Sequence, residues 1–201
     1  MKGEKKLESM ERVKSRMQAS RILLDLNGGR SPDCNIDSKQ SITELISDSR
    51  RVTPGSAFFA LPGLRSNGNE YVQEALDRGA RAIITEDPSV DVPLSVAKIC
   101  VNDARKSLAK YSKRYYGSPD EHLDLVGVTG TNGKTTVTTL TRHLLEEPGH
   151  PVGLIGTVSY HLGDREVPSF RTTPEATDLY SLLRSMLVGG CSEAVMEVSS
   201  H

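Results

Sequence analysis

The amino-acid sequence predicts an α/β protein built from two units. Short apolar runs of strand character alternate with segments of helical spacing from about residue 41 onward. Glycine, proline and serine lie at most of the changes between them. In the second half, an apolar strand leads directly into a glycine-bearing turn and a helix, as in parallel phosphate-binding folds. With 201 residues, the chain is long enough for two small domains that each bury a core.

The first half alternates between strands and helices. Tyr71, Val72, Ala75 and Leu76 recur at helical spacing, and Gly79 is placed to end that helix. The elements expected here are, in order, an apolar stretch within 41–50, a strand at 57–61, a helix at 70–79, strands at 81–86 and 97–101, and a helix at 103–116.

Turn residues at 117–122 follow that helix and predict the linker between the two units. The elements expected after it are a strand at 123–129, a helix at 134–147, a strand at 152–158, a helix at 173–187 and a strand at 193–200. In the second of these helices, Pro174 stands at the first position and Thr173 is placed to cap it. A parallel sheet has only about three strands by the last residue, against ~5–6 in a typical sheet. We therefore expect a chain truncated at its C-terminus.

Composition and charge exclude several classes of protein. The formal net charge of -1 argues against a nucleic-acid partner. Cys34, Cys100 and Cys191 are widely spaced, so neither a disulfide framework nor a zinc site is expected. No secretory signal follows the lysine-rich start, and no apolar run approaches the ~20 residues of a membrane span. We expect a cytoplasmic protein that does not insert into membranes.

The stretch VGVTGTNGKTTVTTL at 126–140 carries the clearest chemical signal. In the general phosphate-loop pattern G-x-x-x-x-G-K-[ST], a glycine would stand at position 128, where this chain has Val128. Gly130 and Gly133 still allow backbone N–H groups to approach phosphate oxygens. Lys134 would contact the β- and γ-phosphates, and the Thr135 hydroxyl would contact Mg²⁺.

The alternative is an incidental glycine turn with a solvated lysine. The apolar strand before the turn and the helix directly after it form the context that the motif requires, which favours a nucleotide site. The loop itself does not distinguish ATP from GTP, because the base is recognised elsewhere.

The segment TGTNGKTT at 129–136 resembles the ATP loop of the Mur ligase family, the amide-forming enzymes of peptidoglycan assembly. In that family the loop is commonly G-T-N-G-K-T/S-T, so the shifted glycine matches it. DSRRVTPGSAFFALPG at 48–63 resembles the family's uridine-nucleotide-binding element. VGLIGTV, TTPE at 172–175 and MEVSSH at 196–201 resemble the members that add the third residue of the stem peptide.

The resemblance implies a fold and domain boundaries. A variable segment at 1–40 would precede a small α/β domain at 41–118 that binds the UDP-sugar. Residues 119–201 would begin a central, parallel-sheet ATPase domain of phosphate-loop type. The family's carbamylated lysine and its amino-acid-binding domain would lie beyond residue 201.

The resemblance also implies site residues. The ATP-binding residues would be Gly130, Thr131, Asn132, Gly133, Lys134, Thr135 and Thr136. The substrate-binding residues would be Ser47, Ser49, Thr172, Thr173 and Ser199. Thr135 and Glu197 would bind Mg²⁺, and the catalytic residues would be Lys134, Thr135 and Glu197.

Simpler interpretations exist for some of these residues. Asp48 and Arg50 could form a surface ion pair of little energetic value. Thr172 and Thr173 could be only a helix cap. Glu197 follows an apolar strand, and a buried carboxylate needs a partner or a metal.

The implied reaction is ATP-dependent amide formation. The γ-phosphate passes to the D-glutamate carboxylate of UDP-MurNAc-L-Ala-D-Glu, and the amine of meso-diaminopimelate or L-lysine attacks the acyl phosphate. The alternatives are a sibling ligase that adds D-Ala-D-Ala, a folate polyglutamate synthase, and a non-catalytic fragment that binds UDP-sugar or nucleotide. For the 201-residue chain alone, we expect binding without turnover.

Overall fold

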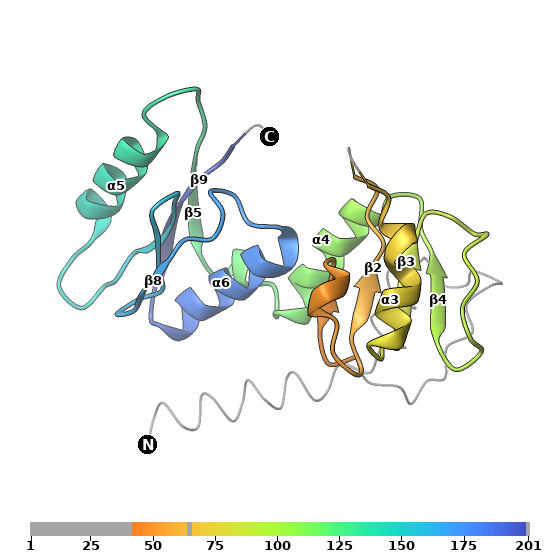
Figure 1. Cartoon of the computed structure of the whole chain (residues 1–201). Helices are drawn as coiled ribbons and strands as arrows, with labels where there is room; N and C mark the ends of the chain where they lie inside the picture. Colours follow the sequence, from red (N-terminus) through yellow and green to blue (C-terminus); the bar gives the residue numbers. More distant parts are fainter. Residues whose placement is uncertain (1–41, 64–65, 200–201) are drawn as a thin grey trace, which may run out of the picture. The chain divides into compact units, whose positions relative to one another are not determined.

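The computed structural model describes residues 42–63 and 66–199, which form two compact units (Figure 1). The first unit ends at Tyr115 and the second begins at Tyr116. The predicted segment 1–40 lies outside the described residues. Within the described ranges, no helix combines the length and the apolar character needed to cross a bilayer.

The first unit contains a four-stranded parallel sheet in the order β1-β2-β3-β4. Its strands are β1 (Leu45–Ile46), β2 (Ala57–Phe59), β3 (Ala82–Thr85) and β4 (Ala97–Cys100). Its helices are the 3₁₀ turns η1 (Ser49–Arg51) and η2 (Gly68–Tyr71), followed by α3 (Val72–Asp77) and α4 (Ala104–Tyr115). The helix predicted at 70–79 therefore begins as a 3₁₀ turn.

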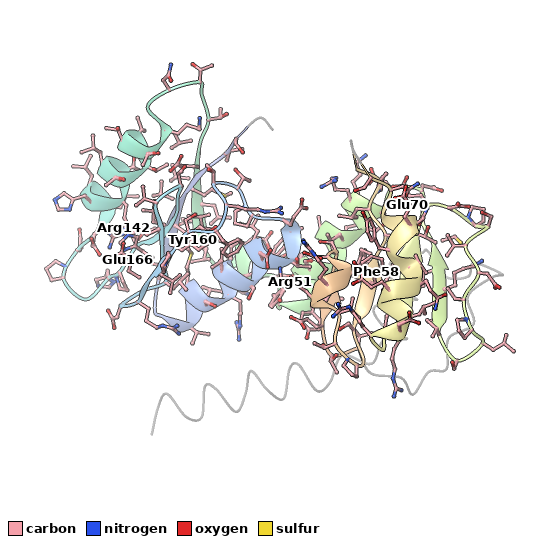
Figure 2. The ribbon with its side chains drawn as sticks, in the orientation of Figure 1. Arg51, Phe58, Glu70, Arg142, Tyr160 and Glu166 are labelled. Carbon is pink, nitrogen blue, oxygen red and sulfur yellow. The ribbon has the colours of Figure 1, made fainter. Side chains whose placement is uncertain are left out.

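Helices cover both faces of this sheet. Successive strand residues point to opposite faces, so neighbouring residues contact different helices. Phe58 of β2 packs in a core cluster with Val72 and Ala75 of α3 (Figure 2). Its neighbour Phe59 makes an edge-to-face contact with Tyr111 of α4, with ring centroids 5.5 Å apart. All residues of β2 and β3 are consequently buried.

The second unit contains a five-stranded sheet in the order β5-β9-β6-β7-β8. Its strands are β5 (Asp124–Val128), β6 (Gly153–Ile155), β7 (Ser159–His161), β8 (Glu166–Pro168) and β9 (Glu193–Glu197). The 3₁₀ turn η3 (Pro119–Glu121) precedes them, and the helices are α5 (Lys134–Leu145) and α6 (Ala176–Val188). Strands β5, β9 and β6 are parallel, as predicted. The antiparallel strands β7 and β8 were not predicted, because their three-residue segments lack an apolar run.

Alternation along the strands places α5 and α6 on opposite faces of this sheet. Val195 of β9 belongs to a core cluster with Leu154 and Val128, and α5 packs against β5, β6 and β9. Ala194 belongs to the cluster that contains Leu183 of α6. This sheet is less completely covered than the first one. Strand β5 lies at its edge and is mostly exposed.

Several sequence-based boundaries are wrong. The strands predicted to reach residues 158 and 200 end at Ile155 and Glu197, and two helix boundaries also differ. The helix predicted from residue 173 begins at Ala176, and its N-cap is Glu175 rather than Thr173. The helix predicted to reach residue 147 ends at Leu145, where Glu146 takes an extended conformation. At Thr173, tertiary partners described below occupy the threonine hydroxyl.

Candidate functional site

The predicted phosphate loop connects β5 to α5 (Figure 1). Gly130 has φ 146° and Gly133 has φ 78°, values that side-chain-bearing residues rarely adopt. Gly133 is the N-cap of α5, so the unpaired N–H groups of the first helical turn open toward the loop. The geometry is that of an anion-binding helix start.

The remaining loop residues keep their polar groups accessible. Thr131 and Asn132 are exposed in the loop, and Thr135 and Thr136 are exposed in the first turn of α5. The Lys134 ammonium reaches back over the loop and donates to the Gly130 carbonyl at 2.7 Å. The Lys134 ammonium thus lies beside the loop whose N–H groups would receive a phosphate.

The missing glycine at position 128 has a structural explanation. Val128 belongs to β5 and contacts the core cluster around Val195. It pairs with Glu197 of β9, and its carbonyl accepts from the Val198 N–H at 2.8 Å. The turn therefore starts after Val128, and the first glycine it needs is Gly130.

The same register places Glu197 beside the start of the loop. Its side chain is only 1% exposed. Thr157, which follows β6, donates to both carboxylate oxygens: its N–H to Oε1 at 2.9 Å and its hydroxyl to Oε2 at 3.0 Å. Thr157 is not among the residues predicted from the sequence. Its available signal was a Gly-Thr pair directly after an apolar strand.

Thr172, Thr173 and Ser199 join this network. The Thr172 and Thr157 hydroxyl oxygens lie 3.1 Å apart. The Thr173 hydroxyl lies 3.2 Å from the Glu197 carbonyl, accepts from the Ser199 N–H at 2.9 Å and contacts the Ser199 hydroxyl at 2.9 Å. The structure thus brings together four residues predicted from the sequence, namely Thr172, Thr173, Glu197 and Ser199.

Tyr160 fixes the segment that carries the two threonines. Its side chain is fully buried in the second unit (Figure 2). The phenol oxygen accepts from the Arg171 N–H at 3.0 Å and donates to the Arg171 carbonyl. The Phe170 ring packs edge-to-face on Tyr160, with centroids 5.2 Å apart. Phe170 and Arg171, the two residues before Thr172, are therefore anchored by the buried Tyr160.

In the first unit, Ser47 and Ser49 follow strand β1. Ser47 is half-buried, whereas Ser49 is buried and donates to Glu74 Oε2 at 2.6 Å. Asp48 and Arg50 form the expected ion pair, with Nε–Oδ1 at 2.9 Å and Nη2–Oδ2 at 2.7 Å. The hydrogen bond from the Arg50 side chain lowers the pKa of Asp48. This pair lies in the predicted uridine element but is engaged within itself.

The donor set fits a hard cation that is shared with a phosphate. In the described ranges, no group of three or more His, Cys, Asp or Glu side chains could hold a metal by itself. Glu197 offers a buried carboxylate, and Thr135 offers an exposed hydroxyl. Mg²⁺ commonly binds through one or two carboxylates plus substrate phosphates, so these oxygen donors suit it.

A glycine turn at the carboxyl end of a parallel strand, opening a helix that starts with lysine, is the arrangement found in nucleotide-phosphate-binding α/β proteins. Comparison with known proteins specifies the class. Residues 41–116 match the family model described as "Mur ligase family, catalytic domain". Residues 128–201 match the model of the Mur ligase middle domain. The chain belongs to the Mur ligase family.

Curated relatives agree along most of the chain. A UDP-N-acetylmuramoyl-L-alanyl-D-glutamate–2,6-diaminopimelate ligase of Geobacter metallireducens is 43% identical over 160 residues, which are 80% of this chain and 31% of that protein. A UDP-N-acetylmuramyl-tripeptide synthetase of Roseiflexus is 44% identical over 162 residues, again 80% of this chain and 32% of that protein. The chain thus spans about a third of the length of these relatives.

Solved structures share the fold. One UDP-N-acetylmuramoyl-L-alanyl-D-glutamate–2,6-diaminopimelate ligase superimposes with a TM-score of 0.71 at 25% identity, covering 89% of this chain and 36% of the other. The MurF ligase of Thermotoga maritima in complex with ADP gives 0.52 at 26% identity, covering 78% of this chain and 32% of the other. The α/β fold predicted from the sequence is therefore confirmed.

Proposed function

We propose that this chain forms the UDP-sugar-binding domain and the first part of the ATP-binding domain of a peptidoglycan-precursor ligase. The enzyme would add a diamino acid to the D-glutamate of UDP-MurNAc-L-Ala-D-Glu. The observation that carries this proposal is the network joining Glu197, Thr172, Thr173 and Ser199 beside the start of the phosphate loop. Domain boundaries at 118 and 119 remain part of the proposal.

The loop and the start of α5 would hold ATP. Backbone N–H groups and Lys134 would surround the phosphate oxygens and neutralise charge during phosphoryl transfer. The proposed ATP contacts are Gly130, Thr131, Asn132, Gly133, Lys134, Thr135 and Thr136. Glu197 and Thr135 would hold Mg²⁺, which supplies charge stabilisation at the phosphoryl group when bound.

Thr172, Thr173 and Ser199 would bind the muramoyl-dipeptide, and Ser47 and Ser49 would contact its uridine nucleotide. Phosphoryl transfer to the D-glutamate carboxylate would give an acyl phosphate, which the amine of the diamino acid attacks with loss of phosphate. The names of the relatives favour 2,6-diaminopimelate over L-lysine. The D-Ala-D-Ala-adding type is the less favoured alternative, because the MurF structures superimpose with TM-scores of 0.52 to 0.57, below the 0.71 of the diaminopimelate ligase.

Calorimetric titration of this chain tests the binding step. We expect MgATP and UDP-MurNAc-L-Ala-D-Glu to bind, and Lys134→Ala to weaken MgATP binding at least tenfold. Lys110→Ala, which removes an exposed lysine in the other unit, serves as the matched control. Binding of neither ligand by the folded chain would contradict the proposal.

A coupled ADP-release assay tests the ligation step. We expect no turnover by the 201-residue chain alone. If the reading frame continues past residue 201, the longer product should release ADP only with both the dipeptide and the diamino acid present. Release of ADP without a UDP-muramoyl-tripeptide, measured by mass spectrometry, would reject the ligase assignment.

A further inference from the structure

Thr157 lies at the centre of the Glu197 network, and its hydroxyl can donate only one hydrogen bond. A threonine hydroxyl carries one proton, and an ionised carboxylate can only accept. The Thr157 hydroxyl donates to Glu197 Oε2 at 3.0 Å, so its proton lies on that bond. Thr157 must then act as the acceptor in its 3.1 Å contact with Thr172.

The number of available protons fixes the direction of these hydrogen bonds. Thr172 donates to Thr157, and Thr157 donates to Glu197. Thr172 has therefore used its only proton, and its remaining capacity toward a ligand is that of an acceptor. Thr157 is exposed and Thr172 is half-exposed, so a ligand can reach both. A carboxylate or phosphate would find no donor in the Thr172 hydroxyl, whereas an amide N–H would find an acceptor.

We propose that Thr157 positions the Glu197 carboxylate and, through the same hydroxyl, makes Thr172 an acceptor for an amide N–H of the substrate dipeptide. This inference rests on the proposed function for the identity of the ligands. The backbone N–H of Thr157 fixes Oε1 and its hydroxyl fixes Oε2, so one residue orients both oxygens. Partners of metal-binding groups typically change metal affinity by ~10–100-fold when removed.

The first test requires no ligand. Thr157→Val, Thr172→Val and the double variant form a thermodynamic cycle measured by urea unfolding. We expect non-additive shifts of the unfolding midpoint, because the two hydroxyls share one bond. Additive shifts would overturn the proposed hydrogen-bond chain.

The second test measures Mn²⁺ binding to the chain in the presence of ATP, by electron paramagnetic resonance. Thr157→Val should weaken Mn²⁺ binding by ~10-fold or more. Thr157→Ser, which keeps the hydroxyl, should stay close to the unchanged protein. ATP binding in EDTA should not change in either variant. Thr139→Val, the same substitution at an exposed site on α5, is the matched control. Equal Mn²⁺ affinity in Thr157→Val and the unchanged protein would overturn the positioning role.

The third test uses UDP-MurNAc-dipeptide analogues in which an ester oxygen replaces one amide N–H at a time. One analogue should bind the unchanged chain at least tenfold more weakly than the parent, and Thr172→Val should remove that difference. Equal binding of every analogue and the parent would overturn the acceptor role of Thr172. If the unchanged chain binds neither Mn²⁺ with ATP nor the dipeptide, the proposed function fails, and the unfolding cycle alone decides whether the hydrogen-bond chain exists.

Discussion

The two units each contain a sheet with parallel strands, four-stranded in the first unit and mixed in the second, and the two sheets are covered to different extents. In the first unit, every residue of β2 and β3 is buried between helices. In the second, the strand that leads into the phosphate loop is exposed, with Leu125 at 41% and Val126 at 38%. Among the described residues, the apolar strands β2 and β3 are therefore buried, whereas the edge strand β5 is exposed.

The helices repeat this contrast. Leu108 of α4 is fully buried, whereas Leu140 of α5 is 57% exposed and Leu144 is 82% exposed. Helix α5 turns Thr138 toward the protein interior, where its hydroxyl donates to the Thr135 carbonyl. Apolar burial consequently stabilises the first unit more than the loop-bearing part of the second. Around the candidate site, hydrogen bonds between polar groups hold the segments together.

The largest expected effect tests this difference directly. Leu108→Ala should destabilise the first unit by ~2–5 kcal/mol, because it leaves a cavity in a packed core. Leu140→Ala makes the same chemical change on an exposed helix face and should stay within ~0.5 kcal/mol. Urea unfolding of both variants measures the difference. Similar losses in the two variants would show that the contrast in burial does not govern stability.

The next largest effect concerns the hydrogen bonds between Glu197 and Thr157 in the second unit. Glu197→Ala leaves the Thr157 N–H and hydroxyl without their carboxylate, and such a loss typically costs ~1–3 kcal/mol. Glu193→Ala, in the same strand but half-buried, is the matched control and should cost less. Unfolding midpoints and hydrogen exchange at the Thr157 amide test this expectation. Unchanged protection of that amide in Glu197→Ala would argue against the network.

Alanine substitutions at two glycines distinguish the effect of backbone strain from an effect on ligand binding. Gly133 and Gly117 both have φ 78°, and neither has an atom within 4 Å of an added Cβ. Alanine at either position should cost ~1–2 kcal/mol, since left-handed backbone is unfavourable for it. Only Gly133→Ala should also weaken MgATP binding, as measured by calorimetry. Equal ATP affinity in the two variants would indicate that the loop does not hold the phosphates.

The smallest expected effect is a pH dependence confined to the second unit. All five histidines lie after residue 121, and burial lowers the pKa of His161 below its ordinary value. The unfolded chain then binds the proton more readily, so stability should fall as pH drops through the unfolded pKa near 6.5 and level off below the folded one. His161→Asn should flatten this dependence in urea unfolding between pH 7.5 and 5. If the pH dependence of stability is unchanged in His161→Asn, another titratable group must cause it.

Local patterns in the sequence determined the alternating elements, the glycine turn and the polar residues that follow the strands. Gly79 ends its helix with φ 91° as predicted, because a helix end and a positive φ are local requirements. Residue spacing likewise indicated the α/β class. These features depend on neighbours within a few positions along the chain, which a linear pattern records.

Only the tertiary structure decided which distant groups meet. Thr173 looked like a helix cap, yet its hydroxyl is engaged by Ser199 and the Glu197 carbonyl, 24 to 26 residues away. Thr157 reaches Glu197 across 40 positions, and the short strands β7 and β8 form only by pairing with β6 and each other. Such contacts depend on strand order and register, which bring carboxyl ends of separate strands to one edge. The sequence alone therefore predicted the glycine turn and the helix after it, and the fold decided how Glu197 is held beside them.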